Sequence, residues 1–234
     1  MTPSPSERFA LYWAPPAADA LWRFGARWLG RDPATAAESP PGAGAPADPA
    51  WLRAATAEPR HYGLHATLKP PFRLATGQSR PALVAALEDV AATLAPVAGP
   101  PLALRRLGRF LALVPSGPAP AIAALAARLV ETFDGFRAPP GAAELAKRRA
   151  HGLTPVQEAH LARWGYPYVM GEFRFHVTLS GALEPDALDR LEALLQPLVA
   201  PFTTAPLAIA ELALFEQAET AQPFRLTRRF PLGG

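Results

Sequence analysis

The sequence predicts an α+β fold in which two pseudo-symmetric lobes, each an antiparallel sheet with outer helices, meet at a central cleft. Two stretches alternate apolar and polar residues strictly, as half-buried strands do, and each carries His-x-Thr followed by leucine. Each stretch precedes a segment with helical spacing and one or two further alternating segments. We therefore expect a single bilobal domain over residues 1–234, with lobes at about 8–135 and 165–234 and a helical insert at 139–165.

The remaining elements follow from periodicity and from helix-ending signals. Residues 8–14 alternate as a first strand, residues 17–29 show helical spacing up to Gly30, and the Pro-, Gly- and Ala-rich residues 31–50 are expected to form a mobile loop. Further helices are predicted at 51–57, 80–94, 119–133, 144–150, 154–164 and 186–198. Further strands are predicted at 102–107 and 109–114, joined by a turn at Gly108, and at 207–215 and 224–230.

Composition restricts the class of protein. The chain has 234 residues, half of them hydrophobic, which is enough for a sizeable core. It contains no cysteine, so disulfides, thiolate metal sites and a cysteine nucleophile are excluded. No apolar run approaches the roughly 20 residues that span a bilayer, and no secretory signal is visible, so we expect a cytoplasmic location and no membrane partner. A net charge of +3, with basic residues in small groups, favours a small anionic partner.

The polar faces of the two His-x-Thr stretches carry the candidate site. The first stretch spans residues 63–69 and the second spans residues 173–180. Residues two apart on a strand lie about 6.5–7 Å apart on one face, so each motif presents an imidazole and a hydroxyl side by side to one ligand. The polar side chains on these two faces are His65, Thr67 and Lys69, and Arg174, His176, Thr178 and Ser180.

Two imidazoles that face one ligand are suited to acid–base chemistry near neutral pH, which makes His65 and His176 the candidate catalytic residues. One would accept a proton while the other donates one, and the near-equivalent motifs leave the assignment open. The threonine hydroxyls can donate hydrogen bonds to phosphate oxygens, and Lys69 and Arg174 can neutralise negative charge. No cofactor is expected. No metal is expected either, because the motifs supply no ligand cluster and His61 would lie about 13 Å from His65 along a strand.

These motifs resemble those of the 2H phosphoesterase superfamily, which is named for paired His-x-Thr/Ser motifs. The resemblance rests on residues 65–68 (HATL) and 176–179 (HVTL). Three longer segments, residues 8–16, 60–72 and 164–170, look like those of the DUF1045 proteins, a branch associated with phosphonate metabolism. All four His and Thr positions match.

The resemblance implies a phosphoric diester hydrolase that opens a cyclic phosphodiester without a metal. The implied substrate is 5-phosphoribosyl 1,2-cyclic phosphate in phosphonate catabolism. Two alternatives stay open: an enzyme of RNA ends, either a 2′,3′-cyclic phosphodiesterase or a 2′,5′ RNA ligase-like enzyme, and a non-catalytic protein that binds nucleotides or RNA. Candidates for binding a second phosphate are Arg105, Arg106, Arg109, Lys147, Arg148 and Arg149.

Several of these residues also have plainer interpretations. Lys69 and Arg174 are as readily solvated charges at strand ends as phosphate ligands. Tyr12 and Tyr168 are further substrate-binding candidates, although tyrosines at such positions commonly pack structurally. The two histidines of the polar insert, His151 and His160, are expected to face solvent.

Overall fold

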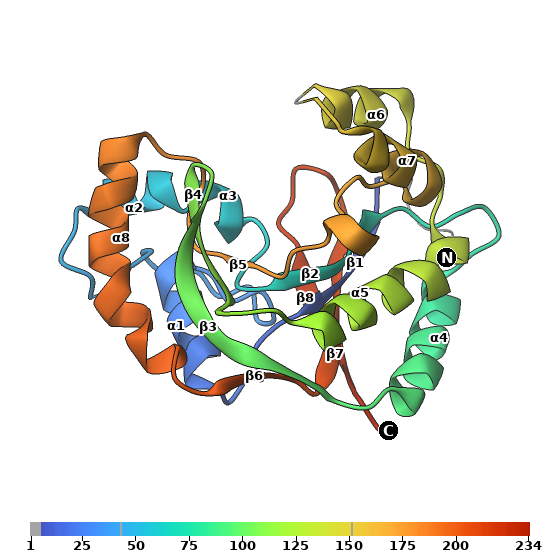
Figure 1. Ribbon diagram of the computed structural model, residues 1–234, viewed down its shortest axis with the longest axis horizontal. Coiled ribbons are helices and arrows are strands. Elements are labelled where there is room, and N and C mark those ends of the chain that lie inside the picture. Colours follow the sequence, from blue (N-terminus) through green and yellow to red (C-terminus); the bar gives the residue numbers. More distant parts are fainter. Residues whose placement is uncertain (1–5, 43, 151) are drawn as a thin grey trace.

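One continuous antiparallel sheet runs through the part of the chain that the computed structural model describes, residues 6–42, 44–150 and 152–234 (Figure 1). The strand order is β6-β3-β4-β5-β2-β1-β7-β8. The strands are β1 (Arg8–Trp13), β2 (Ala66–Phe72), β3 (Val97–Leu107), β4 (Phe110–Pro115), β5 (Val177–Thr178), β6 (Pro206–Ile209), β7 (Glu211–Gln217) and β8 (Arg225–Pro231).

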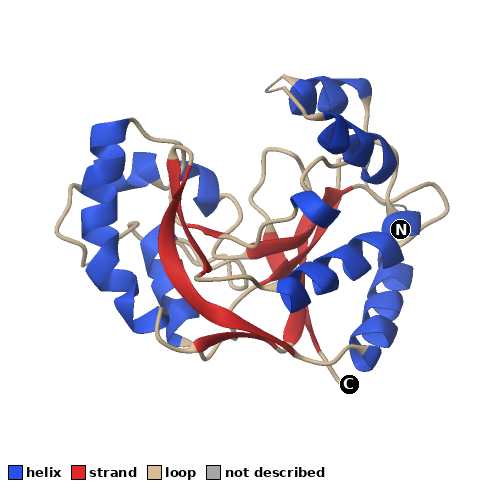
Figure 2. Cartoon of the chain, viewed as in Figure 1, coloured by secondary structure: helices blue, strands red, loops and turns tan. Residues whose placement is uncertain are grey.

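Helices surround this sheet (Figure 2). They are α1 (Ala20–Leu29), α2 (Pro49–Ala55), α3 (Ala57–Arg60), α4 (Arg80–Thr93), α5 (Pro120–Thr132), α6 (Ala142–Arg149), α7 (Pro155–Trp164) and α8 (Pro185–Val199), with 3-10 turns at η1 (Asp134–Phe136), η2 (Met170–Glu172) and η3 (Ala200–Phe202). Helices α1, α2 and α8 lie on one side of the view and α4 and α5 on the other, while α6 and α7 project above the sheet (Figure 1). No helix within the described ranges is long and apolar enough to cross a membrane.

The predicted α+β class is confirmed, but the strands form one sheet and not two separate ones. Strand β5 joins the two groups of four, because it pairs with β4 on one side and with β2 on the other. The group β6-β3-β4-β5 consists of four consecutive strands from the middle of the chain, whereas the group β2-β1-β7-β8 combines the first two strands with the last two. The chain therefore crosses between the two halves of the sheet more than once.

The helix ends follow the capping signals in the sequence. The carboxylate of Asp19 accepts a hydrogen bond from the amide of Leu21 at the start of α1, and Gly30 ends that helix in the left-handed conformation (φ 71°). Thr154 and Gln157 form a reciprocal capping box at the start of α7. These local signals explain why the predicted helices form within a few residues of their expected bounds.

The second His-x-Thr strand is shorter than predicted. Residues 173–179 alternate in burial as expected, but ladder pairing is confined to Val177 and Thr178. A cavity of about 490 Å³ is lined both by Val114 and Pro115 at the end of β4 and by residues 173–175. The two segments splay apart around this cavity, so the backbone cannot complete the ladder there.

Strand β2 also differs from its predicted bounds, because it begins at Ala66 and continues through Pro70 and Pro71. Prolines are tolerated within a strand where no neighbour needs their missing N–H group. Its pairing with β5 is recorded only at Ala66↔Val177, so the two prolines have no ladder to break on that side. The strand predicted at 207–215 is split at Ala210 into β6 and β7.

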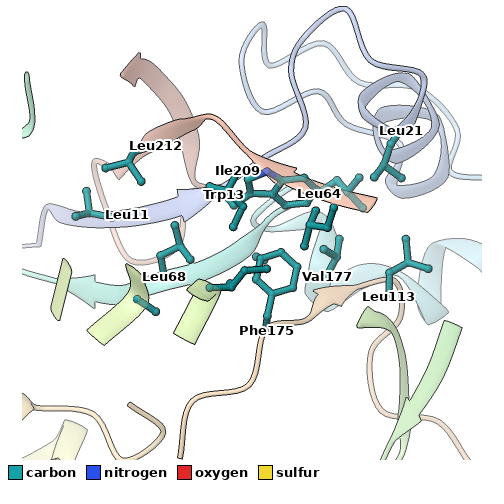
Figure 3. Packing of buried hydrophobic residues seen from close by; sticks show 14 of the residues in the cluster. Leu11, Trp13, Leu21, Leu64, Leu68, Leu113, Phe175, Val177, Ile209 and Leu212 are labelled. Carbon is teal, nitrogen blue, oxygen red and sulfur yellow. The ribbon is translucent and has the colours of Figure 1, made fainter. Parts of the chain in front are cut away.

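Successive side chains of β1 point alternately into two hydrophobic clusters. Leu11 and Trp13 join the large cluster that also holds Leu64, Leu68 and Phe175 (Figure 3). The intervening residues of β1 face a smaller cluster, composed of Ala10, Tyr12, Ala14, Trp22, Ala213, Phe215, Phe224 and Leu226, with Tyr62 packed against it. The second cluster stabilises the half of the sheet that carries the first motif.

The loop expected at residues 31–50 is anchored to this smaller cluster. The Arg31 side chain is 3% exposed and donates a hydrogen bond of 2.6 Å to the carbonyl of Phe224. The backbone of Arg31 also pairs with that of Glu38 in an isolated antiparallel β-bridge. These contacts tie the first part of the loop to the sheet, contrary to the expectation of a mobile segment.

Candidate active site

The register between β2 and β5 brings both His-x-Thr motifs to the same face of the sheet. Ala66 lies opposite Val177, so one step along the register in either direction places His65 across from Thr178 and Thr67 across from His176. Side chains directly opposite each other in an antiparallel pair point to one face, with Cβ atoms about 4.5–5.5 Å apart. The two motif strands are therefore neighbours in the sheet, as a ligand shared by both motifs requires.

The two imidazoles are oriented by equivalent hydrogen bonds. Nδ1 of His65 lies 2.9 Å from the carbonyl oxygen of Gly63, and Nδ1 of His176 lies 2.8 Å from that of Arg174. A carbonyl can only accept, so each Nδ1 carries the proton and each neutral ring keeps Nε2 as its acceptor. Within the described residues neither Nε2 has a hydrogen-bond partner, so both are available to a ligand.

The surroundings of His65 keep its ring neutral. The Tyr12 ring stacks on it at a centroid distance of 4.1 Å, and the Tyr62 ring lies 5.4 Å away. Burial lowers the pKa of His65 to about 4; the hydrogen bond to Gly63 opposes this shift, and the proximity of His176 adds to it. Near neutral pH, His65 can therefore accept a proton at Nε2 but has none to donate there.

The second histidine borders open space. His176 lies beside Phe110, with ring centroids 6.1 Å apart, and lines a cavity of about 820 Å³. Other polar groups on the wall of this cavity, called here the two-histidine cavity, are Thr67, Arg106, Gln157, Tyr166, Tyr168, Glu172 and Arg174. His65, Thr178 and Tyr12 are not among the residues that line it, so the first histidine lies deeper than the second.

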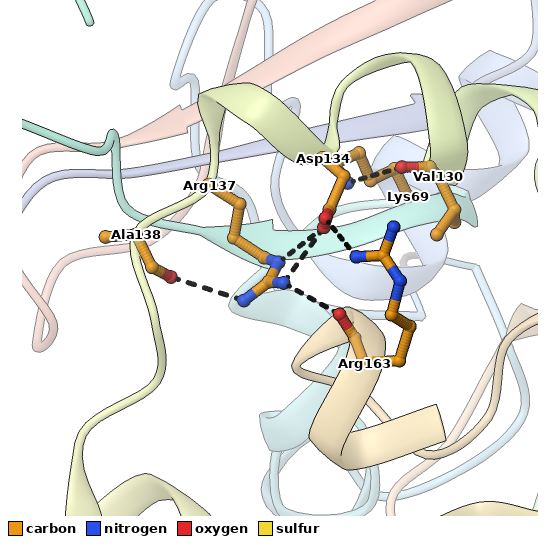
Figure 4. Close-up of polar contacts among 6 residues, drawn as sticks. All are labelled: Lys69, Val130, Asp134, Arg137, Ala138 and Arg163. Carbon is orange, nitrogen blue, oxygen red and sulfur yellow. Dashed lines mark hydrogen bonds and ion pairs between the residues drawn. The ribbon is translucent and has the colours of Figure 1, made fainter. Parts of the chain in front are cut away.

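Lys69 does not accompany Thr67 as strict alternation predicts. The pairing of β1 with β2 shifts register on both sides of the Leu11↔Lys69 pair, and such irregularities redirect side chains. The Lys69 ammonium instead donates to the carbonyl of Val130, 3.1 Å away, in the last turn of α5 (Figure 4). This interaction caps an otherwise unpaired helix carbonyl and leaves the lysine 2% exposed.

The two candidate tyrosines lie in different environments. Tyr12 is 1% exposed, and burial raises the pKa of its phenol well above the ordinary value. It contacts the imidazole of His65 and does not line the cavity. Tyr168 is 44% exposed and lies on the cavity wall, where its ring packs edge-on against Tyr166 at 5.8 Å. Only Tyr168 is therefore placed to meet a ligand directly.

Three of the six candidate second-phosphate residues are already paired with carboxylates. Arg106 pairs with Asp189 and Glu192, and Arg109 pairs with Glu184. In the insert, Arg149 pairs with Glu158, whereas the guanidinium of Arg148 lies over the ring of Tyr166, 4.5 Å from its centroid. Tyr166 was not among the predicted site residues, although it lies in the segment at 164–170 that carried the family resemblance.

The remaining histidines do not form a metal site in the described part of the chain, where no group of three or more His, Cys, Asp or Glu is arranged to hold an ion. His61 Nε2 lies 2.9 Å from the amide nitrogen of Gln217, which donates to it. His160 is half-buried with an unpartnered Nδ1, so its predicted full exposure is wrong. His151 lies outside the described residues.

Fold and site together define an α+β protein with two His-x-Thr strands at the centre of its sheet and a cavity beside them. The chain belongs to the family described as "Protein of unknown function (DUF1045)", whose model matches residues 67–225.

Two curated relatives carry a functional name. The chain is 39% identical, over 97% of its length, to "Ribose 1,5-bisphosphate phosphokinase PhnN" of Janthinobacterium sp. (strain Marseille). It is 37% identical, over 94% of its length, to the protein of the same name from Laribacter hongkongensis (strain HLHK9). Each match covers 51% of the relative, so the chain spans about half the length of the curated relatives it matches.

These names contradict the activity predicted from the sequence. A phosphokinase is a transferase, whereas the prediction was a phosphoric diester hydrolase that opens a cyclic phosphodiester. They equally contradict the two alternatives, an enzyme of RNA ends and a non-catalytic nucleotide- or RNA-binding protein. The DUF1045 assignment itself is confirmed. The error arose because paired histidines specify proton transfer at a phosphorylated ligand, and this chemistry does not fix the reaction class.

Proposed function

We propose that this chain binds ribose 1,5-bisphosphate in the two-histidine cavity and so holds the phosphoryl acceptor of the reaction for which its relatives are named. The observation that carries the proposal is the register of β2 and β5, which gathers two imidazoles and two hydroxyls on one face beside a cavity of about 820 Å³. Sugar-phosphate sites need this combination of hydrogen-bond donors, positive charge and an enclosed space.

Several polar groups on the wall have roles suited to a sugar phosphate. The Arg174 guanidinium is exposed, lines the cavity and has no carboxylate within 4.0 Å among the described residues, so its charge is available to a phosphate. The hydroxyl of Thr67 can donate to a phosphate oxygen, and Tyr168 can donate to the sugar. His176 offers Nε2 from the same wall.

The neutral ring of His65 suits the acceptor side of a phosphoryl transfer. When an acceptor oxygen attacks phosphorus, the new O–P bond forms as the bond from phosphorus to the donor's leaving oxygen breaks. Where the attacking oxygen carries a proton, the unprotonated Nε2 of His65 is the group that would accept it, although a pKa of about 4 makes this nitrogen a weak base. Phosphoryl transfer depends mainly on such positioning and on charge stabilisation.

We further propose that the chain shares the bilobal two-histidine architecture of the 2H superfamily, as an arrangement of strands and not as a hydrolytic activity. Support comes from the two groups of four strands and from the meeting of both motifs at β2 and β5. On this proposal the lobes are the two halves of the sheet, and residues 139–165 are an insert above them.

Calorimetric titration of the purified chain with ribose 1,5-bisphosphate tests the binding. We expect saturable binding that weakens about 10- to 100-fold in Arg174→Gln, the range for losing a hydrogen bond to a charged group. The control is Arg53→Gln, which removes an exposed charge on α2 outside the cavity and should leave the dissociation constant unchanged. No binding by the wild type, or equal effects of the two variants, would contradict the proposal.

Phosphoryl transfer is tested separately with ATP, Mg²⁺ and ribose 1,5-bisphosphate, followed by ³¹P NMR. His65→Asn should lower the transfer rate by about 10²-fold, the usual effect of losing a positioned proton acceptor. Normal turnover in this variant would exclude the role given to His65. Binding without any transfer would limit this chain to holding the sugar.

A further inference from the structure

The end of α6 carries three consecutive basic residues above the two-histidine cavity. Lys147, Arg148 and Arg149 form the last turn of this helix, in the insert that projects from the sheet (Figure 1). Arg149 is neutralised, because its guanidinium donates to the carboxylate of Glu158 on the neighbouring helix α7. This exposed pair links α6 to α7.

Arg148 does not itself line the two-histidine cavity, but it contacts a residue that does. Its guanidinium lies over the ring of Tyr166, 4.5 Å from the centroid, and Tyr166 lines the two-histidine cavity. No carboxylate lies within 4.0 Å of Arg148 in the described part of the chain, and the side chain is half-buried. A half-buried cation that is held by an aromatic ring and lacks a carboxylate is well placed to bind an anion.

Tyr166 adds a hydroxyl to the same position. Burial raises the pKa of its phenol, although Arg148 acts in the opposite direction, so the hydroxyl stays protonated and can donate. The cation–π contact holds the guanidinium near this hydroxyl. The wall formed by the insert therefore presents a planar charged fork and a phenol, the groups that recognise a phosphate end-on.

We propose that Arg148 and Tyr166 bind the second phosphate of the sugar and select bisphosphorylated over monophosphorylated ribose. This inference rests on the proposed function, in which the first phosphate lies against Thr67, His176 and Arg174. A bisphosphorylated sugar then spans the cavity from the sheet to the insert. The insert supplies selectivity, while the sheet supplies the histidines.

Titrations with three ligands test the proposal: ribose 1,5-bisphosphate, ribose 1-phosphate and ribose 5-phosphate. Arg148→Gln should weaken binding of the bisphosphate about 10- to 100-fold. It should leave one of the two monophosphates unaffected, namely the one whose phosphate lies at the histidines. Tyr166→Phe keeps the ring under the guanidinium and should weaken the bisphosphate about 3- to 10-fold. Arg148→Lys keeps the charge without the fork and should give an intermediate loss.

Arg149→Gln is the matched control, because it changes the neighbouring residue on the same turn and removes only the exposed pair with Glu158. It should leave all three affinities within twofold of the wild type. Bisphosphate binding that is unchanged in Arg148→Gln, or an equal loss for all three ligands, would overturn this inference. Failure of the wild type to bind any of the three would instead overturn the proposed function.

Discussion

The two histidines share a motif and a hydrogen-bond pattern but not an environment. His65 and His176 both stand two residues before a threonine, and both donate from Nδ1 to the carbonyl two residues earlier. His65 is packed between tyrosine rings and is held neutral, whereas His176 borders the two-histidine cavity. The motif therefore leaves Nε2 of each histidine available to a ligand, and the side chains around each ring determine how deeply that ring is buried.

The difference can be traced to one position on each flanking strand. Thr67 of the first motif lies opposite Tyr12 on β1, whereas Thr178 of the second lies opposite Ala112 on β4. The large phenol covers the first imidazole and removes water from it. The methyl group of Ala112 offers no such cover. The residues opposite the two threonines therefore differ in size, and the rings of Tyr62 and Phe110 add to the difference between the sites.

The largest expected effect concerns stability around the first motif. Tyr12→Ala should cost about 3–5 kcal/mol of unfolding free energy, because it removes a buried ring that packs against His65 and Phe215. Phe110→Ala, beside His176, removes a half-buried ring and should cost about 1–2 kcal/mol. Urea denaturation of both variants measures the difference. Equal losses would mean that the two environments are not distinct.

A second effect depends on pH. The pKa of folded His65, about 4, lies below its ordinary value of 6.5, so the unfolded chain binds the proton more readily and the folded state loses stability as pH falls from about 6.5 to about 4. The loss should reach at most about 3 kcal/mol. Thermal unfolding at pH 7 and pH 4.5 should show a smaller acid-dependent loss in His65→Gln than in the wild type. His176→Gln should retain the loss, because His65 is still present.

The smallest expected effect concerns the threonines. Thr67 lines the cavity and Thr178 does not, so Thr67→Val should weaken ribose 1,5-bisphosphate binding about 3- to 10-fold and Thr178→Val should weaken it less. Valine preserves shape and strand propensity, which limits the change to the hydroxyl. Calorimetry would settle the order, and a larger effect at Thr178 would show that the ligand lies deeper than the cavity wall.

Local signals were sufficient to predict much of this molecule. Helix ends followed from Gly30 and Thr154, and the two His-x-Thr stretches lie side by side, as a ligand shared by both motifs requires. The predictions that failed were those that depend on contacts with residues distant in the sequence. Alternation placed Lys69 on the motif face, but the register shift of β1 against β2 and the unpaired end of α5 gave it a different role.

The site was predicted in type but not in detail. Arg174 was a candidate, yet Arg106 and Arg109 could not be recognised as paired, because their carboxylate partners lie more than 70 residues away in the chain. Tyr166 could have been found, since its segment had already been singled out. The reaction class could not be read from residues that serve proton transfer in many enzymes.

The shortness of β5 has a mechanical consequence. This two-residue strand is the only strand between β4 and β2 in the described sheet, and its registered pairing with β2 is Ala66↔Val177 alone. The two histidines therefore flank the shortest strand of the described sheet, and α5 contacts strands on either side of it, β2 and β3. The spacing of the two imidazoles thus depends on one two-residue strand, whereas the outer strands of the sheet are held by longer ladders.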